Sequence, residues 1–124
     1  MLEVSGGHAL RAKVYIDRRV LVVRLFGVLS PDSLAGVARA LARRYGRVVR
    51  AFVVDFRGGL LAAASWELKL IKGLPMPGAF VAEGPAYDSL RLHCLRRETE
   101  GLARRVTTDL QVAVSWASEQ ASRA

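Results

Sequence analysis

The sequence alternates between two hydrophobic patterns. Short apolar runs rich in β-branched and aromatic residues predict strands over residues 14–17, 20–26, 50–57, 79–82 and 104–107. Longer stretches, in which apolar residues recur every three or four positions, predict helices over residues 31–45, 65–72, 86–100 and 109–117. Because helices and strands alternate after an opening pair of strands, we expect an α/β fold that begins with an antiparallel hairpin and continues as parallel strands.

The first predicted helix has clear start and stop signals and two distinct faces. Ser30 can cap its amino end, Pro31 suits the first helical position, and Gly46 is a suitable stop. An apolar stripe is expected to face the sheet and consists of Leu34, Val37, Ala38, Leu41, Ala42 and Tyr45. Basic side chains step by four along the opposite face, at Arg39, Arg43 and Arg47.

The later helices carry weaker signals. In the helix over residues 86–100 we expect a buried set of Tyr87, Leu90, Cys94 and Leu95. Thr108 and Gln111 match a capping box at the start of the last helix, with Thr108 as the cap.

The chain is organised around the predicted strand over residues 50–57 and the residues that follow it. A carboxylate, Asp55, interrupts the apolar run, paired glycines end it, and Ser65 is positioned to cap the next helix. Open α/β sheets usually place their sites at the carboxyl end of a central strand. Asp55 could be functional there or could accept backbone N–H groups of the following loop. The candidate partner- or ligand-binding residues are Asp55, Arg57, Gly58, Gly59, Ser65, Trp66 and Tyr87.

The chain length of 124 residues suits one domain, which we place at residues 13–118, between a flexible arm (1–12) and a polar tail (119–124). With Cys94 as the single cysteine, neither an internal disulfide nor a multi-cysteine zinc site can form, and we expect Cys94 in the core. The amino-terminal residues lack the apolar region of a signal peptide, and no apolar run reaches the ~20 residues of a membrane span. We therefore expect a cytoplasmic protein.

The net charge of +8 has two interpretations. A basic surface, concentrated at Arg39, Arg43 and Arg47, could bind nucleic acid electrostatically. The same arginines could equally form an ordinary solvated helix face, and we favour this interpretation because no groove helix or stacking motif accompanies them.

Motifs of catalysis are missing from the sequence. It contains no phosphate-binding loop, no dinucleotide fingerprint, no nucleophile elbow and no cysteine–histidine cluster for zinc. We therefore expect a non-enzymatic protein without a cofactor or a bound metal.

Several local patterns, taken in order, resemble the STAS-domain superfamily and, within it, the SpoIIAA-like proteins of bacteria. They are the hairpin that ends in residues 22–27, the Ser30-Pro31 helix start, the strand at residues 53–55, and the stretch from Arg105 to Trp116. The resemblance implies a mixed sheet of four to five strands, with about four helices packed mainly on one face. It also implies a regulatory or binding role.

In the anti-sigma-factor antagonists of this superfamily, a serine that opens the helix after the central strand is phosphorylated by a partner kinase. The resemblance places that serine at Ser65. The family usually has Asp-Ser-Ser/Thr-Gly there, whereas this chain reads Ala64-Ser65-Trp66-Glu67. Ser65 could be such a switch or only a helix cap.

Two further partner classes stay open. Because SpoIIAA-like proteins have been grouped with SEC14-type lipid-binding domains, a small apolar ligand could bind in a cleft between Trp66, the loop over residues 75–77 and the Tyr87 helix. A homodimer is also compatible with the sequence. The leading hypothesis is a binding module that engages a protein partner or a small ligand through the loop and helix after the central strand, over residues 58–71.

Overall fold

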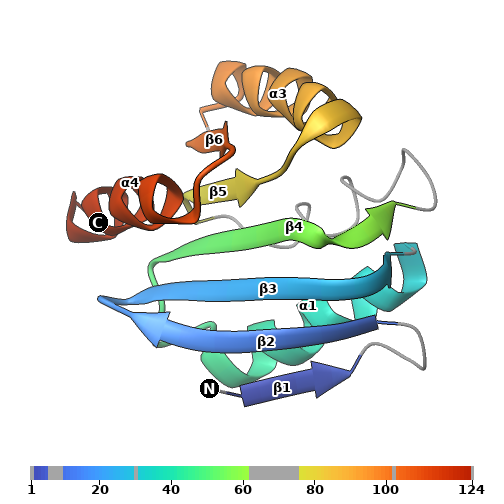
Figure 1. The fold of residues 1–124 in the computed structure, drawn as a ribbon. Coiled ribbons are helices and arrows are strands. Elements are labelled where there is room, and N and C mark those ends of the chain that lie inside the picture. The colour runs from blue at the N-terminus through green and yellow to red at the C-terminus, as the bar shows by residue number, and fades with distance from the viewer. Residues whose placement is uncertain (1, 6–9, 30, 62–75, 102, 124) are drawn as a thin grey trace.

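The computed structural model describes residues 2–5, 10–29, 31–61, 76–101 and 103–123 (Figure 1). The strands and helices, in chain order, are β1 (Leu2–Ser5), β2 (Leu10–Asp17), β3 (Val20–Leu29), α1 (Pro31–Tyr45), β4 (Ala51–Leu61), β5 (Gly78–Val81), α3 (Gly84–Thr99), β6 (Arg104–Thr107) and α4 (Leu110–Arg123). The predicted helix over residues 65–72 lies outside the described residues.

The six strands form one mixed sheet in the order in which they follow one another along the chain, β1-β2-β3-β4-β5-β6. Strands β1, β2 and β3 are antiparallel neighbours, whereas β3, β4, β5 and β6 pair in parallel. The α/β class, the opening hairpin and the parallel later part are therefore confirmed.

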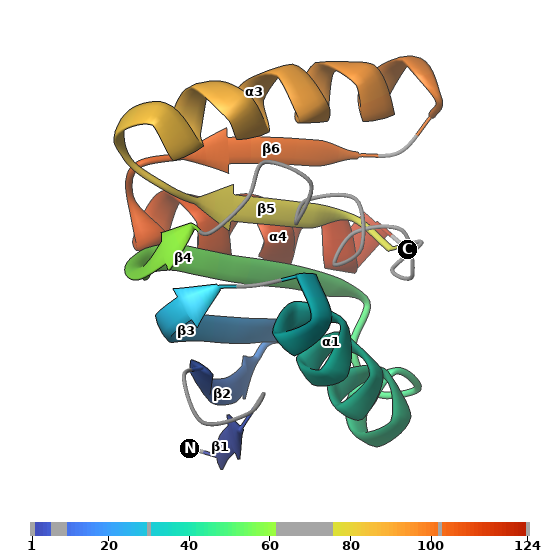
Figure 2. The same cartoon turned by 90° about the vertical axis from the view of Figure 1, so that its right-hand side faces the viewer.

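The helices cover the two faces of the sheet unequally (Figures 1 and 2). Right-handed crossovers that always advance in the same direction along a sheet place their helices on one face. Val37 of α1 and Leu90 of α3 accordingly share one buried cluster with Val23 and Val54 of the sheet. The terminal helix α4 makes no crossover and lies on the other face, where its Ala113, Val114 and Ala117 pack on the sheet.

Strands β2 and β3 are joined by a two-residue turn at Arg18 and Arg19, both with positive φ, at 50° and 65°. Positive φ at both central residues is the mark of the type I′ turn, whose twist matches that of a hairpin. The position of the turn was predicted correctly. Its positive φ angles could not be predicted, because a type I′ turn usually contains asparagine and glycine and this one contains two arginines.

Several strand boundaries differ from the prediction. Residues 2–5 form β1 and β2 begins at Leu10, so the expected flexible arm over residues 1–12 is wrong for these segments. Four residues are too few for an alternating pattern to be recognised, and backbone pairing with β2 holds the strand. Strand β3 passes Gly27 and β4 passes the paired glycines, because the two strands continue to pair as far as Leu29 and Leu61.

Two helix assignments are also corrected. Leu95 of α3 is 53% exposed rather than buried, whereas Cys94 lies in the core as expected. The cap of α4 is Asp109 and not Thr108, since Asp109 Oδ1 accepts the backbone N–H of Val112 at 3.1 Å. Asp109 is an equally good cap residue and lies directly before the first helical residue.

Candidate functional site

A polar hollow of about 350 Å³ lies where β3 and β4 approach their carboxyl ends, on the face of the sheet that carries α4. Strands β3 and β4 and the connection between β5 and α3 contribute to it, and its lining consists of Arg24, Leu25, Phe26, Asp55, Arg57, Gly58 and Glu83. The predicted site residues Asp55, Arg57 and Gly58 are in this hollow, but they lie within β4, which continues to Leu61, and level with the carboxyl end of β5, where Asp55 pairs with Val81.

An irregularity in the pairing of β3 with β4 shapes the hollow. Arg24 lies opposite Asp55, but Phe26 lies opposite Gly58, so β4 has one extra residue between these two pairs. Such bulges bend a strand and redirect its side chains. A Cβ on Gly58 would lie 2.6 Å from Phe26 Cδ1 and 2.8 Å from the carbonyl oxygen of Leu25. The hollow therefore depends on the absence of a side chain at Gly58.

Asp55 is buried beneath the hollow and is held by Arg57. The Asp55 Oδ1 atom accepts the backbone N–H of Arg57 and its Nε–H, both at 3.0 Å. The Oδ2 atom accepts a third hydrogen bond from Arg57 Nη2 at 2.9 Å. Asp55 thus accepts a backbone N–H of a residue that follows it, which is one of the two roles that the sequence suggested. In addition, it forms a bidentate ion pair with the Arg57 guanidinium.

A second guanidinium approaches the same carboxylate. Arg24 Nε lies 3.6 Å from Asp55 Oδ2, and the Arg24 side chain is 40% exposed. Among the described residues, this buried Nε has no hydrogen-bond acceptor. The Asp55 carboxylate therefore faces two arginines, and Glu83 adds a second carboxylate to the lining of the hollow.

The arginines also determine the protonation of the pair. Burial raises the pKa of Asp55, but hydrogen bonds from Arg57 and the charges of Arg57 and Arg24 outweigh it and lower the pKa below the ordinary value of 3.8. The hydrogen bond to Asp55 in turn raises the pKa of Arg57. Asp55 is therefore a firmly ionised anchor at neutral pH, and its environment does not suit a general base.

The structure brings together some of the predicted site residues and separates others. Asp55, Arg57 and Gly58 line one hollow, and Gly59 follows within β4, opposite Gly27. Tyr87 lies in a separate hollow of about 160 Å³ between α3 and β6. Ser65 and Trp66 lie outside the described residues.

Four residues of the hollow were missed from the sequence: Arg24, Leu25, Phe26 and Glu83. A signal for Arg24 existed, because it is the one charged residue within the apolar run of β3. Its alignment with Asp55 could not be predicted, since it depends on the register of two parallel strands separated by α1.

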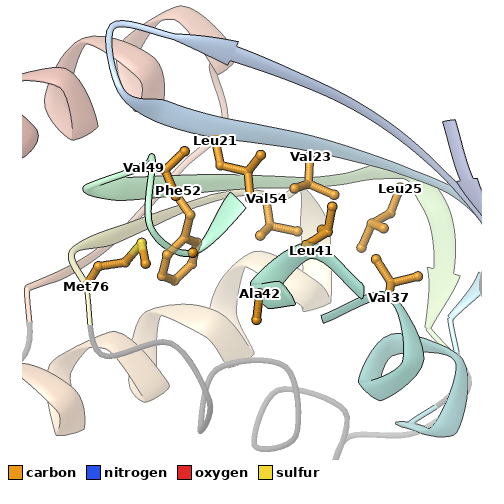
Figure 3. A pocket seen from close by; sticks show the side chains of 11 residues that line it. Leu21, Val23, Leu25, Val37, Leu41, Ala42, Val49, Phe52, Val54 and Met76 are labelled. Carbon is orange, nitrogen blue, oxygen red and sulfur yellow. The ribbon is translucent and has the colours of Figure 1, made fainter. Parts of the chain in front are cut away.

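An apolar cavity between α1 and the sheet bears on the apolar-ligand hypothesis (Figure 3). Its volume is about 30 Å³, enough for one or two water molecules and far too little for a lipid chain. It is lined by Leu21, Val23, Leu25, Val37, Leu41, Ala42, Gly46, Val49, Phe52, Val54 and Met76. Tyr87 does not line it, and Trp66 of the expected cleft is not described.

The basic residues of the nucleic-acid hypothesis remain at the surface. Arg39 and Arg43 lie on α1 and Arg47 follows that helix, and all three are exposed. Exposure agrees with either interpretation of these residues.

Within the described ranges, no group of three or more histidine, cysteine, aspartate or glutamate side chains could hold a metal ion. Nor does any helix in the same part of the chain have the length and apolar character needed to cross a membrane.

Solved structures with the same fold identify the architecture. An anti-sigma factor antagonist from Mycobacterium paratuberculosis is 17% identical, with a TM-score of 0.63 over 92% of this chain and 98% of that one. An uncharacterised protein with a SpoIIAA-like fold from Shewanella loihica is 15% identical, with a TM-score of 0.60 over 89% of this chain and 94% of that one.

The anti-sigma factor antagonist SpoIIAA, in its unphosphorylated form, is 12% identical, with a TM-score of 0.53 over 84% of this chain and 94% of that one. No family model matches the sequence, and no curated protein matches it. The chain therefore has a SpoIIAA-like fold, in agreement with the resemblance found in the sequence.

Proposed function

We propose that this chain, with its SpoIIAA-like fold, is a non-enzymatic regulatory module that binds a protein partner at the hollow around Asp55 of β4 and through the residues that follow this strand. The likeness to two anti-sigma factor antagonists supports a role in protein binding. The observation that carries the proposal is the hollow itself, because its buried carboxylate, Asp55, is already held by Arg57 and Arg24.

The ion pair of Asp55 with Arg57 gives the proposed surface a fixed shape. Three hydrogen bonds between these two residues hold the backbone at the bulge where β4 leaves its regular pairing. A preformed polar surface reduces the side-chain entropy that is lost when a partner binds. The arrangement thus suits recognition better than proton transfer.

Ser65 is the regulatory element of this proposal. It follows the last residue of β4, Leu61, by four positions, and in the superfamily that the sequence resembles a serine that opens the helix after the central strand is phosphorylated. Phosphorylation would add a charge of about −2, together with the bulk of the phosphate, beside the docking surface. The complex with the partner would then dissociate.

The test starts with capture from a nuclease-treated lysate of the native cells, using the full chain as bait. The bait variants are the wild type, Ser65→Ala, Ser65→Asp and, as a matched control, Ser122→Asp at an exposed position of α4. Any captured protein is then purified and its affinity for each bait is measured by calorimetry.

We expect one partner that binds the wild type, Ser65→Ala and Ser122→Asp equally well and binds Ser65→Asp at least tenfold more weakly. Equal affinity for all four baits would remove Ser65 from the binding surface. If no protein binds and an apolar compound instead raises the melting temperature in proportion to its concentration, the proposal is wrong and the apolar-ligand hypothesis replaces it.

A further inference from the structure

The hollow around Asp55 is lined by charged side chains of both signs in equal number. Arg24 and Arg57 supply two guanidinium groups, and Asp55 and Glu83 supply two carboxylates. An ion of a single sign would therefore be attracted by one half of this lining and repelled by the other half. The hollow favours neither a simple anion nor a simple cation.

The part of the sheet that borders the hollow is balanced in the same way. In the register of β1, β2 and β3, Glu3 lies opposite Lys13, and Lys13 lies opposite Arg24. The row continues into β4, where Asp55 is the register partner of Arg24. Two cationic residues thus lie between two acidic ones, and this row adds no net charge beside the hollow.

Two of the four charges in the lining are already paired with each other. Arg57 donates three hydrogen bonds to Asp55, at 2.9 to 3.0 Å. The Asp55 side chain is only 3% exposed, so little of this carboxylate can be reached from the solvent. The pair is therefore a neutral floor of the hollow, and the groups left for a ligand are Arg24 and Glu83.

The Arg24 guanidinium is held near the floor by charge alone. Its Nε lies 3.6 Å from Asp55 Oδ2, which is too far for a hydrogen bond, and this Nε has no acceptor among the described residues. The Arg24 side chain is 40% exposed. Its remaining N–H groups are therefore available to a ligand that carries a carboxylate.

Glu83 supplies the complementary group from the other side of β4. It follows Val81, the last residue of β5, by two positions, and its side chain is exposed. Within the described ranges, its carboxylate makes no hydrogen bond and no ion pair. Since β3 and β5 are the two neighbours of β4, Arg24 and Glu83 reach the hollow from strands on opposite sides of the Asp55–Arg57 pair.

These groups lie close enough together for one small molecule. Arg24 Nε and Arg57 Nη2 lie 3.6 Å and 2.9 Å from the same oxygen of Asp55. The hydrogen bond to Asp55 chiefly raises the pKa of Arg57, and the charges of Asp55, Glu83 and Asp109 add to this rise against the opposing effect of burial. Glu83 is thus near Arg57. The volume of about 350 Å³ falls in the range of small-ligand sites.

We propose that the hollow binds a free α-amino acid in its zwitterionic form. The ligand's carboxylate accepts hydrogen bonds from Arg24, whose planar fork of donors matches a carboxylate, and its ammonium group donates to Glu83. An α-amino acid carries its two charges close together, as the compact lining requires. The inference goes beyond the proposed function, because the ligand binds the chain without a protein partner.

Other ligand classes meet a repulsive group in the hollow. Glu83 repels a phosphate or an acidic peptide, and Arg24 repels an amine that has no carboxylate. Only a ligand that carries both charges satisfies both groups at once.

The test is a titration of the isotope-labelled full chain with L-alanine, followed by the backbone amide NMR signals of Arg57 and Gly58. Propionate lacks the ammonium group of L-alanine and ethylamine lacks its carboxylate, so these two compounds are the matched control ligands. Because the ligand is small and the hollow is open, we expect a dissociation constant of about 1 mM for L-alanine.

Either control ligand should bind at least tenfold more weakly than L-alanine. Equal binding of propionate would make the hollow a plain anion site, and equal binding of ethylamine would make it a plain cation site. Either result would overturn the proposal, and so would the absence of a saturable change with L-alanine.

Variants of the chain assign the two contacts. Arg24→Gln and Glu83→Gln each remove one of them, and Arg39→Gln on α1 and Glu119→Gln on α4 are exposed controls with the same change of charge. We expect each hollow variant to weaken L-alanine binding at least fivefold and each control to weaken it less than twofold. Equal weakening by the controls would contradict the proposal.

Circular dichroism checks that each variant is folded. If Arg24→Gln does not fold, Glu83→Gln decides alone, because Glu83 is exposed and its loss leaves the buried Asp55–Arg57 pair intact.

The inference and the proposed function can fail separately. If L-alanine binds as expected and no protein is captured in the Ser65 experiment, the amino-acid site stands and the proposed function fails. If a partner is captured but L-alanine binds no better than propionate, the proposed function stands and the amino-acid site fails. Where both stand, L-alanine should also weaken the partner, since the two share the hollow.

Discussion

The backbone of Gly78 lies directly against the ring of Phe52, so that a Cβ on Gly78 would be 2.1 Å from Phe52 Cζ. Both residues are paired, since Phe52 of β4 is the register partner of Gly78 at the start of β5. Phe52 is 1% exposed and also contacts the ring of Phe80 edge-on, at 5.8 Å between centroids, so it has no room to move.

Substitution of Gly78 by alanine should therefore strain the core. Inserting a methyl group into a closely packed site costs about 1–3 kcal/mol, and we expect Gly78→Ala to lie at the upper end of this range. Urea denaturation followed by circular dichroism measures the free energy of unfolding.

The control for that prediction is Gly36→Ala in α1. A Cβ on Gly36 meets nothing within 4 Å, and alanine is a better helix former than glycine. We expect Gly36→Ala to raise the free energy of unfolding by about 0.5–1 kcal/mol. If both alanine variants change the stability in the same direction, close packing at Gly78 is not the cause.

The hairpin turn between β2 and β3 offers a stabilising substitution. Arg19 has φ 65°, a conformation that an L-residue with a side chain rarely adopts and that glycine adopts freely. Arg19→Gly should raise the free energy of unfolding by about 1 kcal/mol. Arg19→Ala keeps the Cβ and should bring no gain. A melting temperature that rises equally in both variants would point to the removed charge instead.

The Asp55 cluster predicts a pH-dependent contribution to stability. The pKa of Asp55 in the folded chain lies below its ordinary value of 3.8, because Arg57 and Arg24 stabilise the carboxylate against the opposing effect of burial. A lowered folded pKa means that the contribution is complete above 3.8 and is lost as the pH falls through the folded value. Asp55→Asn should cost about 1–3 kcal/mol at pH 7, since charge-assisted hydrogen bonds are lost.

The difference between the wild type and Asp55→Asn should therefore be constant near neutrality and shrink once the pH falls below 3.8. Chemical denaturation at several pH values measures it. Asp88→Asn on an exposed part of α3 serves as the control and should change the stability by less than about 0.5 kcal/mol. A difference that does not change with acidity would show that Asp55 contributes through packing alone.

The contacts of buried Arg104 predict which of two substitutions, Arg104→Lys or Arg104→Met, destabilises the fold more. It is 1% exposed, and its Nη1 donates to the carbonyl oxygens of Met76 at 2.6 Å and Ala103 at 3.0 Å. Its guanidinium also lies 5.1 Å from the centroid of the Phe52 ring. Arg104→Lys keeps a buried charge but loses the planar fork, whereas Arg104→Met removes the charge at similar volume.

We therefore expect Arg104→Lys to destabilise the fold more than Arg104→Met does, by about 1 kcal/mol or more. Thermal melts of both variants and of an exposed-site control, Arg105→Lys, make the comparison. The opposite order would mean that the positive charge itself, and not the number of its donors, stabilises the position.

Most of the fold could be predicted from the sequence because the relevant signals are local. The alternation in β3 and the start of β6 at Arg104 each depend on residues within one element, and the structure confirms them. Of the predicted stripe of α1, Val37 and Leu41 are buried, whereas Ala42 is exposed. The sequence did not predict the segments that are extended because they pair with a neighbouring strand. Strand β1 and the last residues of β4 owe their extended form to pairing with β2 and β3.

The sequence predicted where along the chain the site lies, but not which residues of other elements complete it. Asp55, Arg57 and Gly58 follow one another in the chain, so the end of the central strand could be located. Arg24 and Glu83 come from other elements, and only the parallel register and the bulge in β4 bring them to Asp55. Tyr87 does not join this group, because it lines a separate hollow between α3 and β6.

The strictly sequential order of the described strands affects how the sheet can assemble. Each strand finds its partner among its nearest neighbours in the chain, so no pairing has to wait for a distant segment. Contacts between residues close in sequence lower the entropy lost in loop closure and speed folding. The sheet can therefore grow outward from the long β2–β3 hairpin, whereas each parallel pair from β3 to β6 must first close the segment of chain that separates its two strands.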